Sequence, residues 1–267
     1  MLKDITLGQF FPGQSFMHKL DPRMKLILTV LYVVNLFLVS RFLGFLIVGG
    51  LMLLVVISSK ISLKVVLRGM RPILFIAAFT AVFNILYGGG EPLFPNIEWL
   101  SWLKTEGVRN ALFMIIRIFL LILGTSYLTY TTSPVMLTDA IERLFRPLSA
   151  IRLPVHELAM MMTIALRFIP TLIDETDKII NAQKARGADF ETGNIIRRAK
   201  SLIPILIPLL ISAFRRAEEL ADAMECRCYH GGKGRTRYKV YYFGWRDWVA
   251  LFLMAASMAG VILLMIF

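Results

Sequence analysis

Five long apolar windows recur along this chain, and they constrain its fold more than any other feature of the sequence. The windows cover residues 26–39, 42–57, 72–87, 110–130 and 248–267, and a single arginine is their only charge. A helix needs roughly 17–25 apolar residues to cross a bilayer, so the last window suffices alone and the first three need their interfacial flanks. Hydrophobic residues make up 57% of the chain and charged residues 18%, an excess of apolar residues over soluble domains. We therefore predict an all-α polytopic membrane protein with about five transmembrane helices.

The charges between these windows predict how the chain is oriented. Residues 58–71 carry four basic side chains and no acid, whereas residues 88–107 carry three glutamates and one lysine in an irregular, glycine- and proline-rich stretch. Basic connections stay in the cytoplasm, so the N-terminus and residues 131–247 are expected inside and the C-terminus outside. The formal net charge of +12 is then mostly an orientation signal and a contact for anionic lipid, with no nucleic acid as partner. The chain is expected to consist of three parts: an N-terminal segment with the first four transmembrane helices (residues 1–130), a cytoplasmic coupling-helix region (131–244) and a C-terminal transmembrane helix (245–267).

Residues 131–247 predict three amphipathic cytoplasmic helices, over residues 133–145, 154–187 and 194–229. The third is expected to stop before a glycine pair at residues 231–232. The last two helices each have an uncharged half that is too short to span a bilayer and a strongly charged half. Prolines would bend both helices. These are Pro170 in the second helix, and Pro204 and Pro208 in the third. We expect two long, bent levers at the inner face of the membrane.

Both long helices end alike, with an arginine between two small residues that follows an acidic cluster. A cation in the last turn complements the helix dipole by a few tenths of a kcal/mol, which would explain either arginine alone. Small flanks, however, leave a guanidinium free to enter a groove and bind carboxylates or carbonyls. Two such tips predict docking onto two similar partners. The tip residues are Ala185, Arg186 and Gly187 in the second helix, and Cys226, Arg227 and Cys228 in the third.

With these tips, the chain closely resembles the transmembrane component of energy-coupling factor transporters, which are modular importers of vitamins and micronutrients. The Ala-Arg-Gly tip matches that family in full, whereas the second tip has a cysteine where the family usually has an alanine after Met-Glu. The resemblance covers essentially the whole chain. Its further motifs are Gly13-Gln14-Ser15, His18, residues 20–23, Lys25, residues 167–170 and residues 231–236.

The resemblance implies a non-catalytic scaffold in a four-part importer of the prokaryotic plasma membrane. Two cytoplasmic ATPases would bind ATP and magnesium and would each accept one arginine tip, so this chain itself needs no cofactor. A membrane-embedded S component would capture the substrate and pack on the apolar faces of the levers. ATP binding would move the tips and rock the levers against the S component. The expected S-component platform consists of Met160, Met161, Leu166, Leu202, Leu206, Leu209, Leu210 and Phe214.

Other chemistries fit the sequence less well. The glycine-rich stretch 231–234 fails the phosphate-loop pattern, because Arg227 and Gly234 stand where a glycine and a Ser/Thr are required. His156-Glu157 lacks the second histidine of a zinc protease helix. Cys226, Cys228 and His230 offer three soft ligands without an evident fourth, so no metal site is predicted.

Two alternative functions remain open: a permease subunit of another ABC system, and a polytopic membrane enzyme. No nucleophile with an adjacent base is evident, which counts against the enzyme. Two separate arginine tips count against an ordinary permease. Arg117, the charge inside the fourth window, is either functional or structurally paired.

Overall fold

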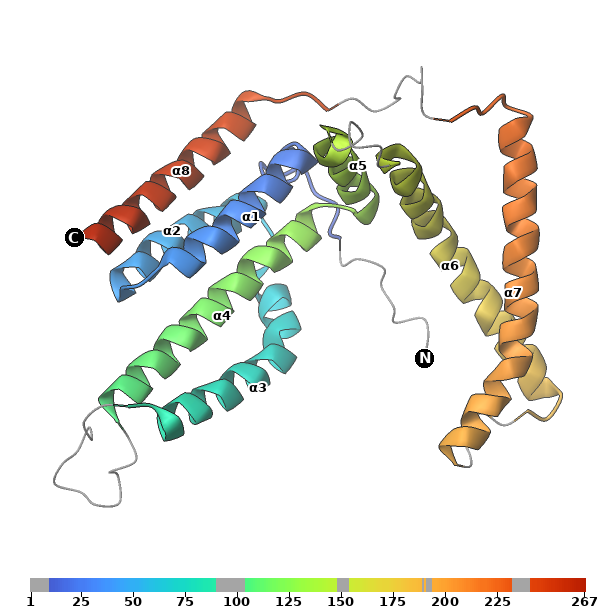
Figure 1. Ribbon diagram of the computed structural model, residues 1–267, viewed down its shortest axis with the longest axis horizontal. Helices are drawn as coiled ribbons and strands as arrows, with labels where there is room; N and C mark the ends of the chain where they lie inside the picture. The colour runs from blue at the N-terminus through green and yellow to red at the C-terminus, as the bar shows by residue number, and fades with distance from the viewer. Residues whose placement is uncertain (1–9, 90–103, 148–153, 189, 191–193, 232–240) are drawn as a thin grey trace. The chain divides into compact units, whose positions relative to one another are not determined.

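The computed structural model describes residues 10–89, 104–147, 154–188, 190, 194–231 and 241–267, and the regular structure of these residues is helical (Figure 1). The chain forms two compact units, of which the larger comprises residues 8–140 and 240–267 and the smaller residues 1–7 and 141–239. The sequence-based prediction of an all-α polytopic membrane protein is confirmed. Most of the predicted irregular outer loop (residues 90–103) and most of the glycine-rich stretch 231–234 lie outside the described residues.

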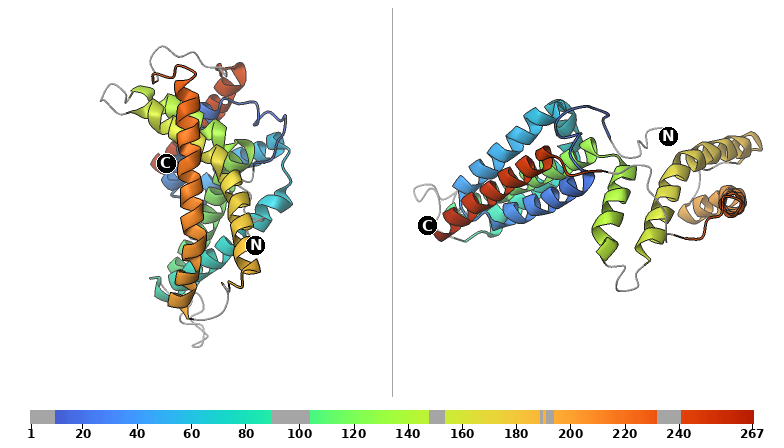
Figure 2. Two further views of the ribbon diagram at one scale, coloured as in Figure 1. Left: turned by 90° about the vertical axis from the view of Figure 1, so that its right-hand side faces the viewer. Right: turned by 90° about the horizontal axis from the view of Figure 1, so that it is seen from above.

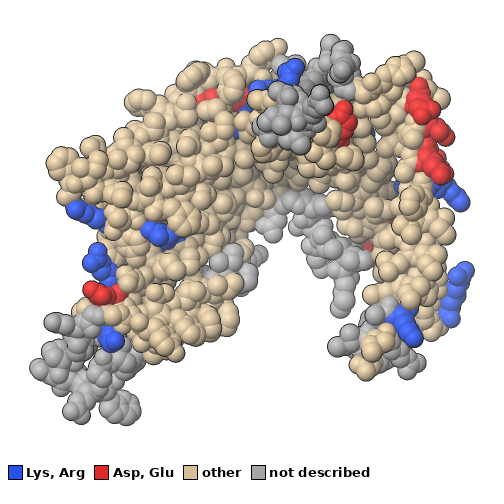
Figure 3. Space-filling view, viewed as in Figure 1, with Lys and Arg blue, Asp and Glu red and all other residues tan. Residues whose placement is uncertain are grey.

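The larger unit is a bundle of long apolar helices. They are α1 (Pro22–Leu38), α2 (Phe42–Ser59), α3 (Leu63–Tyr87), α4 (Thr105–Thr131) and α8 (Trp245–Ile266). Helix α1 packs against α4 and α8, α2 packs against α8 and α4, and α3 pairs with α4 (Figure 2). On the face shown in Figure 3, most of the bundle surface carries no charge, which suits contact with lipid.

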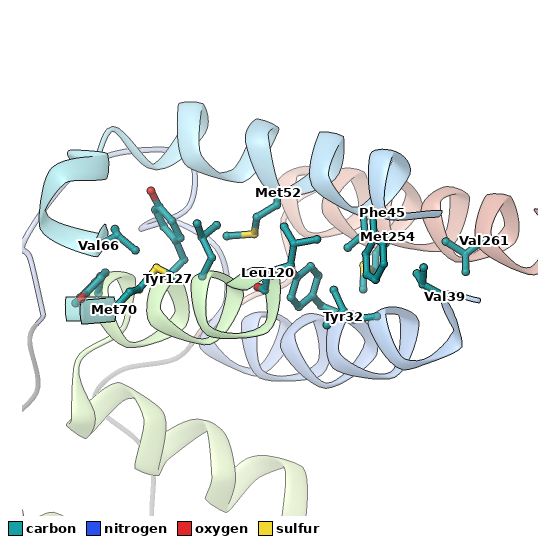
Figure 4. Close-up of a cluster of buried hydrophobic side chains, with 14 residues drawn as sticks. Tyr32, Val39, Phe45, Met52, Val66, Met70, Leu120, Tyr127, Met254 and Val261 are labelled. Atoms are coloured by element: carbon teal, nitrogen blue, oxygen red, sulfur yellow. Dashed lines mark hydrogen bonds between the residues drawn. The ribbon is translucent and has the colours of Figure 1, made fainter. Parts of the chain in front are cut away.

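The core of the bundle is built from side chains of all five helices (Figure 4). Leu36 and Val48 are fully buried, whereas Leu46 and Phe252 on the outer faces are each 73% exposed. Apolar side chains that face outward are favourable in hydrocarbon, so apolar residues both in the core and on the outer faces are expected for a membrane bundle. The other core members include Tyr32, Val39, Phe45, Met52, Val66, Met70, Leu120, Leu123, Tyr127, Tyr130, Met254 and Val261.

Four described helices are long and apolar enough to cross a membrane, and three of them, α2, α4 and α8, coincide with predicted spans. Helix α1 has 17 residues, and α3 begins nine residues before its predicted window, so its apolar part is only Phe75–Tyr87. Both therefore need interfacial flanks, as the sequence predicted. The fourth candidate is α6 (Val155–Ala185), which the sequence analysis assigned to the cytoplasm. Its apolar first half extends past Arg167 to Ile173 and thereby satisfies the length criterion.

Arg117, inside α4, caps the end of α1. Its Nη2 donates to the carbonyl of Val39, the C-cap residue of α1, at 2.7 Å. The guanidinium also lies over the rings of Phe37 and Phe113, at 5.7 and 5.1 Å from their centroids. A cation at a helix C-terminus satisfies an orphan carbonyl and the negative end of the helix dipole. This geometry supports the structural interpretation of Arg117.

The three predicted amphipathic helices are present as α5 (Pro134–Phe145), α6 (Val155–Ala185) and α7 (Ile195–Glu225). Only the end of the third was wrong: α7 stops before Cys226, four residues earlier than predicted. The cause is Cys228, which adopts φ +56° and so ends the helix ahead of the glycine pair. Helix α7 is bent in its first half, where Pro204 and Pro208 remove backbone donors (Figure 1).

Candidate functional site

Helices α6 and α7 of the smaller unit form an antiparallel pair (Figure 1). They follow each other closely in the chain, which favours an antiparallel arrangement. The first half of α6 contributes Ile164 and Phe168 to a groove whose other wall is formed by Leu220 and Met224 near the end of α7. The C-terminal end of α7 therefore lies beside the first half of α6.

A carboxylate links the two helices at the point where the apolar half of α6 ends. Arg216 Nη2 donates to Glu175 Oε2 at 2.6 Å, and the Ser212 hydroxyl donates to Glu175 Oε1. The Ser212 hydrogen bond first, and then the charge of Arg216, hold the pKa of Glu175 below its ordinary value. These bonds fix the register in which α7 lies along α6.

The α6 tip is closed by a Schellman motif. The N–H of Gly187 donates to the carbonyl of Lys184 at 3.0 Å, and the N–H of Ala188 donates to the carbonyl of Gln183 at 3.0 Å. Gly187 has φ +85°, the left-handed conformation that the motif requires at the residue after the cap. Arg186 is the C-cap residue, so the motif fixes its backbone at the end of α6.

The α7 tip has the same construction. The N–H of Cys228 donates to the carbonyl of Glu225 at 2.8 Å, and the N–H of Tyr229 donates to the carbonyl of Met224 at 3.1 Å. Cys228, with φ +56°, takes the place of Gly187, and Arg227 takes the place of Arg186. A left-handed conformation is strained and uncommon for cysteine, so the residue type at position 228 did not predict this cap.

All six predicted tip residues are exposed. Within the described part of the chain, neither tip guanidinium has a hydrogen-bond or ion-pair partner. Several exposed carboxylates precede Arg227 on the last turns of α7 and form the acidic cluster visible in Figure 3. They oppose the helix dipole, so this composition does not serve the stability of α7. The cluster consists of Glu218, Glu219, Asp222 and Glu225.

The antiparallel pairing places the two tips at opposite ends of the pair (Figure 1). The α7 tip lies near the level of Ile164, and Arg186 is about 20 residues farther along α6, which corresponds to roughly 30 Å at 1.5 Å per residue. The structure therefore does not bring the two arginines into one site. It presents two separate sites of the same geometry.

An exposed apolar stripe runs along α7 and includes most of the predicted platform. Leu202, Leu206, Leu210 and Phe214 are between 48% and 63% exposed, whereas Leu209 is half-buried. On α6, Met161 is exposed, and Met160 and Leu166 are half-buried. The sequence-based platform omitted a second row of exposed residues, which repeats at the same four-residue spacing: Ile203, Ile207 and Ile211. That spacing was the signal that would have identified them.

The histidine and cysteines that were considered for metal binding lie in this smaller unit. His156 Nδ1 lies 3.0 Å from Glu142 Oε1, so this histidine links α6 to α5. Cys226 and Cys228 are free and exposed. Among the described residues, no three His, Cys, Asp or Glu side chains are grouped so that they could hold a metal ion.

Comparison with known proteins gives consistent matches over nearly the full chain. The model of a family described as cobalt transport protein matches residues 13–238. The energy-coupling factor transporter transmembrane protein of Clostridium kluyveri is 54% identical over 252 residues, which cover 94% of this chain and 93% of the relative. The protein of the same name from Ruminiclostridium cellulolyticum is 53% identical and covers 99% of this chain and 98% of the relative. That of Acidaminococcus fermentans is 47% identical over 268 residues.

Proposed function

Because this chain belongs to the family of energy-coupling factor transporter transmembrane proteins, we propose that it couples two cytoplasmic ATPases to a substrate-binding S component. In this proposal the chain is a non-catalytic scaffold in the prokaryotic plasma membrane. ATP and magnesium are bound by the ATPases, and the vitamin or micronutrient is bound by the S component.

The repeated tip geometry carries this proposal. Arg186 and Arg227 occupy the same position in two Schellman motifs, and both are exposed without a partner within the described residues. A guanidinium carried by a cap residue can donate several charge-assisted hydrogen bonds into a complementary groove. Two equal tips roughly 30 Å apart suit two similar subunits, one at each end of the antiparallel pair.

The apolar stripe of α7 supports the proposed contact with the S component. An uncovered row of leucine and isoleucine side chains of this length is unfavourable in water, so it requires a membrane or an apolar partner. In our proposal the S component packs on this stripe, defined here by Leu202, Leu206, Leu210 and Phe214. The same helix thus holds an ATPase at its tip and the S component along its side.

In this proposal, ATP binding moves α6 and α7 against the S component. When the two ATPases close around ATP, their grooves approach each other and displace the two tips. The Glu175–Arg216 and Glu175–Ser212 bonds keep α6 and α7 paired while they move. We also propose that the N-terminus and the coupling helices are cytoplasmic and the C-terminus is extracellular, on the basis of the positive-inside rule.

The test is the double charge reversal Arg186→Glu and Arg227→Glu. Because neither side chain has a partner among the described residues, we expect normal membrane insertion but loss of the ATPases on co-purification. Arg215→Glu is the matched control, since Arg215 is an exposed arginine of α7 outside the tip. Co-purification of normal amounts of ATPase with the double variant would contradict the proposal.

A further inference from the structure

The N-terminal segment, residues 11–25, contacts both places where the coupling region joins the larger unit. The coupling region is defined here as residues 133–242. Its two roots are the end of α4, at Tyr130 to Thr132, and the start of α8, at Phe243 to Asp247. The segment and both roots belong to the larger unit, so their contacts lie within one compact body.

The first set of contacts holds the end of α4. The N–H of Phe11 donates to the carbonyl of Tyr130 at 3.0 Å, and the rings of these two residues meet edge to face at 5.5 Å. Lys25 Nζ donates to the carbonyl of Thr131 at 2.9 Å and to Thr132 Oγ1 at 3.3 Å. Lys25 is only 6% exposed, so these bonds replace water around its ammonium group.

The second set of contacts holds the start of α8. The carboxylate of Asp247 accepts the N–H of Asp21 at 2.9 Å through Oδ1 and the N–H of Gly244 at 2.8 Å through Oδ2. Asp247 is 3% exposed, and one of its oxygens bonds the N-terminal segment while the other bonds the start of α8 itself. The rings of Phe16 and Trp245 meet edge to face, and the Arg23 guanidinium lies 5.7 Å from the centroid of the Phe243 ring.

The segment is braced internally, so it can transmit force between these contacts. His18 bonds through Nδ1 with the hydroxyl of Ser15 at 2.7 Å and through Nε2 with the carbonyl of Phe11 at 2.8 Å. Gly13 lies against the His18 ring, where a Cβ would approach to 2.8 Å. Asp21 also caps α1, since its Oδ1 accepts the N–H of Arg23.

We propose that residues 11–25 form a clasp that holds the two roots of the coupling region together. Lys25, Asp21 and Asp247 are its positioning residues. Lys25 is a buried cation that binds the exit of α4. Asp21 caps α1 with its carboxylate, and the buried carboxylate of Asp247 accepts the Asp21 N–H, which joins the start of α1 to the entry of α8. The mechanical role of the clasp rests on the proposed function. With both roots fixed, displacement of the arginine tips turns α6 and α7, whereas loose roots would absorb it by separating α4 from α8.

The experiment measures the separation of the roots directly, in the full chain in detergent. Val135→Cys and Tyr242→Cys, both at exposed positions, carry spin labels in a chain whose native cysteines are replaced by Cys226→Ser and Cys228→Gly. Pulsed electron paramagnetic resonance then gives the distribution of distances between the labels. We expect one narrow distance in the parent chain and a shift of part of the population to longer distances in Lys25→Met and in Asp247→Ala.

Lys19→Met is the matched control, because Lys19 is an exposed lysine of the same segment, and it should keep the narrow distance. Thr132→Val removes a single acceptor of Lys25 and should give a smaller shift, which keeps the test available if Lys25→Met does not accumulate. Helix content and the thermal midpoint are measured in parallel. Unchanged distances in Lys25→Met and Asp247→Ala, an equal shift in Lys19→Met, or a shift accompanied by general loss of helix would overturn the clasp.

The result is independent of the ATPases. The clasp variants retain both arginine tips, so we expect them to co-purify with ATPase as the parent chain does. Failure of the parent chain to bind ATPase would contradict the proposed function while leaving the distance measurement, and the clasp, intact.

Discussion

Gly187 allows the geometry of the α6 tip to be tested without changing its charge. Its φ is +85°, and a Cβ built on it meets no atom within 4 Å, so Gly187→Ala introduces backbone strain without a steric clash. A left-handed conformation costs an L-residue roughly 1–2 kcal/mol. If an ATPase binds only the capped tip, the apparent affinity falls with the fraction of capped chains, by about 5- to 30-fold at most.

The assay titrates purified ATPase against the chain in detergent, with the α7 tip disabled by Arg227→Glu so that the α6 tip carries the binding. Gly231→Ala is the matched control, because Gly231 has φ +92° and equally open surroundings but lies beyond the α7 tip. In the converse experiment, Arg186→Glu disables the α6 tip so that the α7 tip carries the binding. We then expect Cys228→Gly to bind ATPase more tightly, because it removes the backbone strain of a left-handed cysteine. Unchanged binding by Gly187→Ala, or an equal loss in Gly231→Ala, would refute the reasoning.

Two further predictions concern the apolar stripe of α7 and the Arg117 cap of α1. The double variant Leu206→Gln and Leu210→Gln should release the S component, because both side chains are more than half exposed on the α7 stripe. Co-purification from native membranes measures this release, and full retention of the S component would contradict the proposed platform. Arg117→Met should destabilise the bundle by about 1–3 kcal/mol, because it leaves the carbonyl of Val39 without its donor at 2.7 Å. A thermal midpoint equal to that of the parent chain would show that this bond is dispensable, and Arg117→Lys should retain part of the stability.

Local rules accounted for most of the individual elements. The proline at the start of α5, the 3.6-residue periodicity of α6 and α7, and the charge-free windows predicted the helices because each of these signals acts within a few turns of chain. The Ala185-Arg186-Gly187 tip was also predicted, from an arginine between two small residues at a helix end. The glycine after the cap residue is also what the Schellman motif there requires. The membrane character required only composition and the lengths of the windows.

Other features were invisible in the sequence because they depend on what surrounds a residue. Cysteine rarely adopts a left-handed conformation, so nothing local predicted that Cys228 would end α7 and repeat the α6 tip. The opposite placement of the two tips follows from the antiparallel pairing of α6 and α7, in which Glu175 meets Ser212 and Arg216. The row formed by Ile203, Ile207 and Ile211 is exposed because the pairing with α6 uses another face of α7, the one that carries Ser212 and Arg216.

The sequence by itself thus determined that this chain is a helical membrane protein, where its long helices lie, and that two of them end in similar arginine tips. Only the tertiary structure decided that these tips share one cap geometry and stand roughly 30 Å apart, and that Arg117 closes the end of α1. It also decided that Asp21 meets Asp247 across 226 residues of sequence, next to a buried Lys25. The physical reason is that caps and periodicity are encoded within a few residues, whereas the burial and pairing of a charge are set by the helices packed around it.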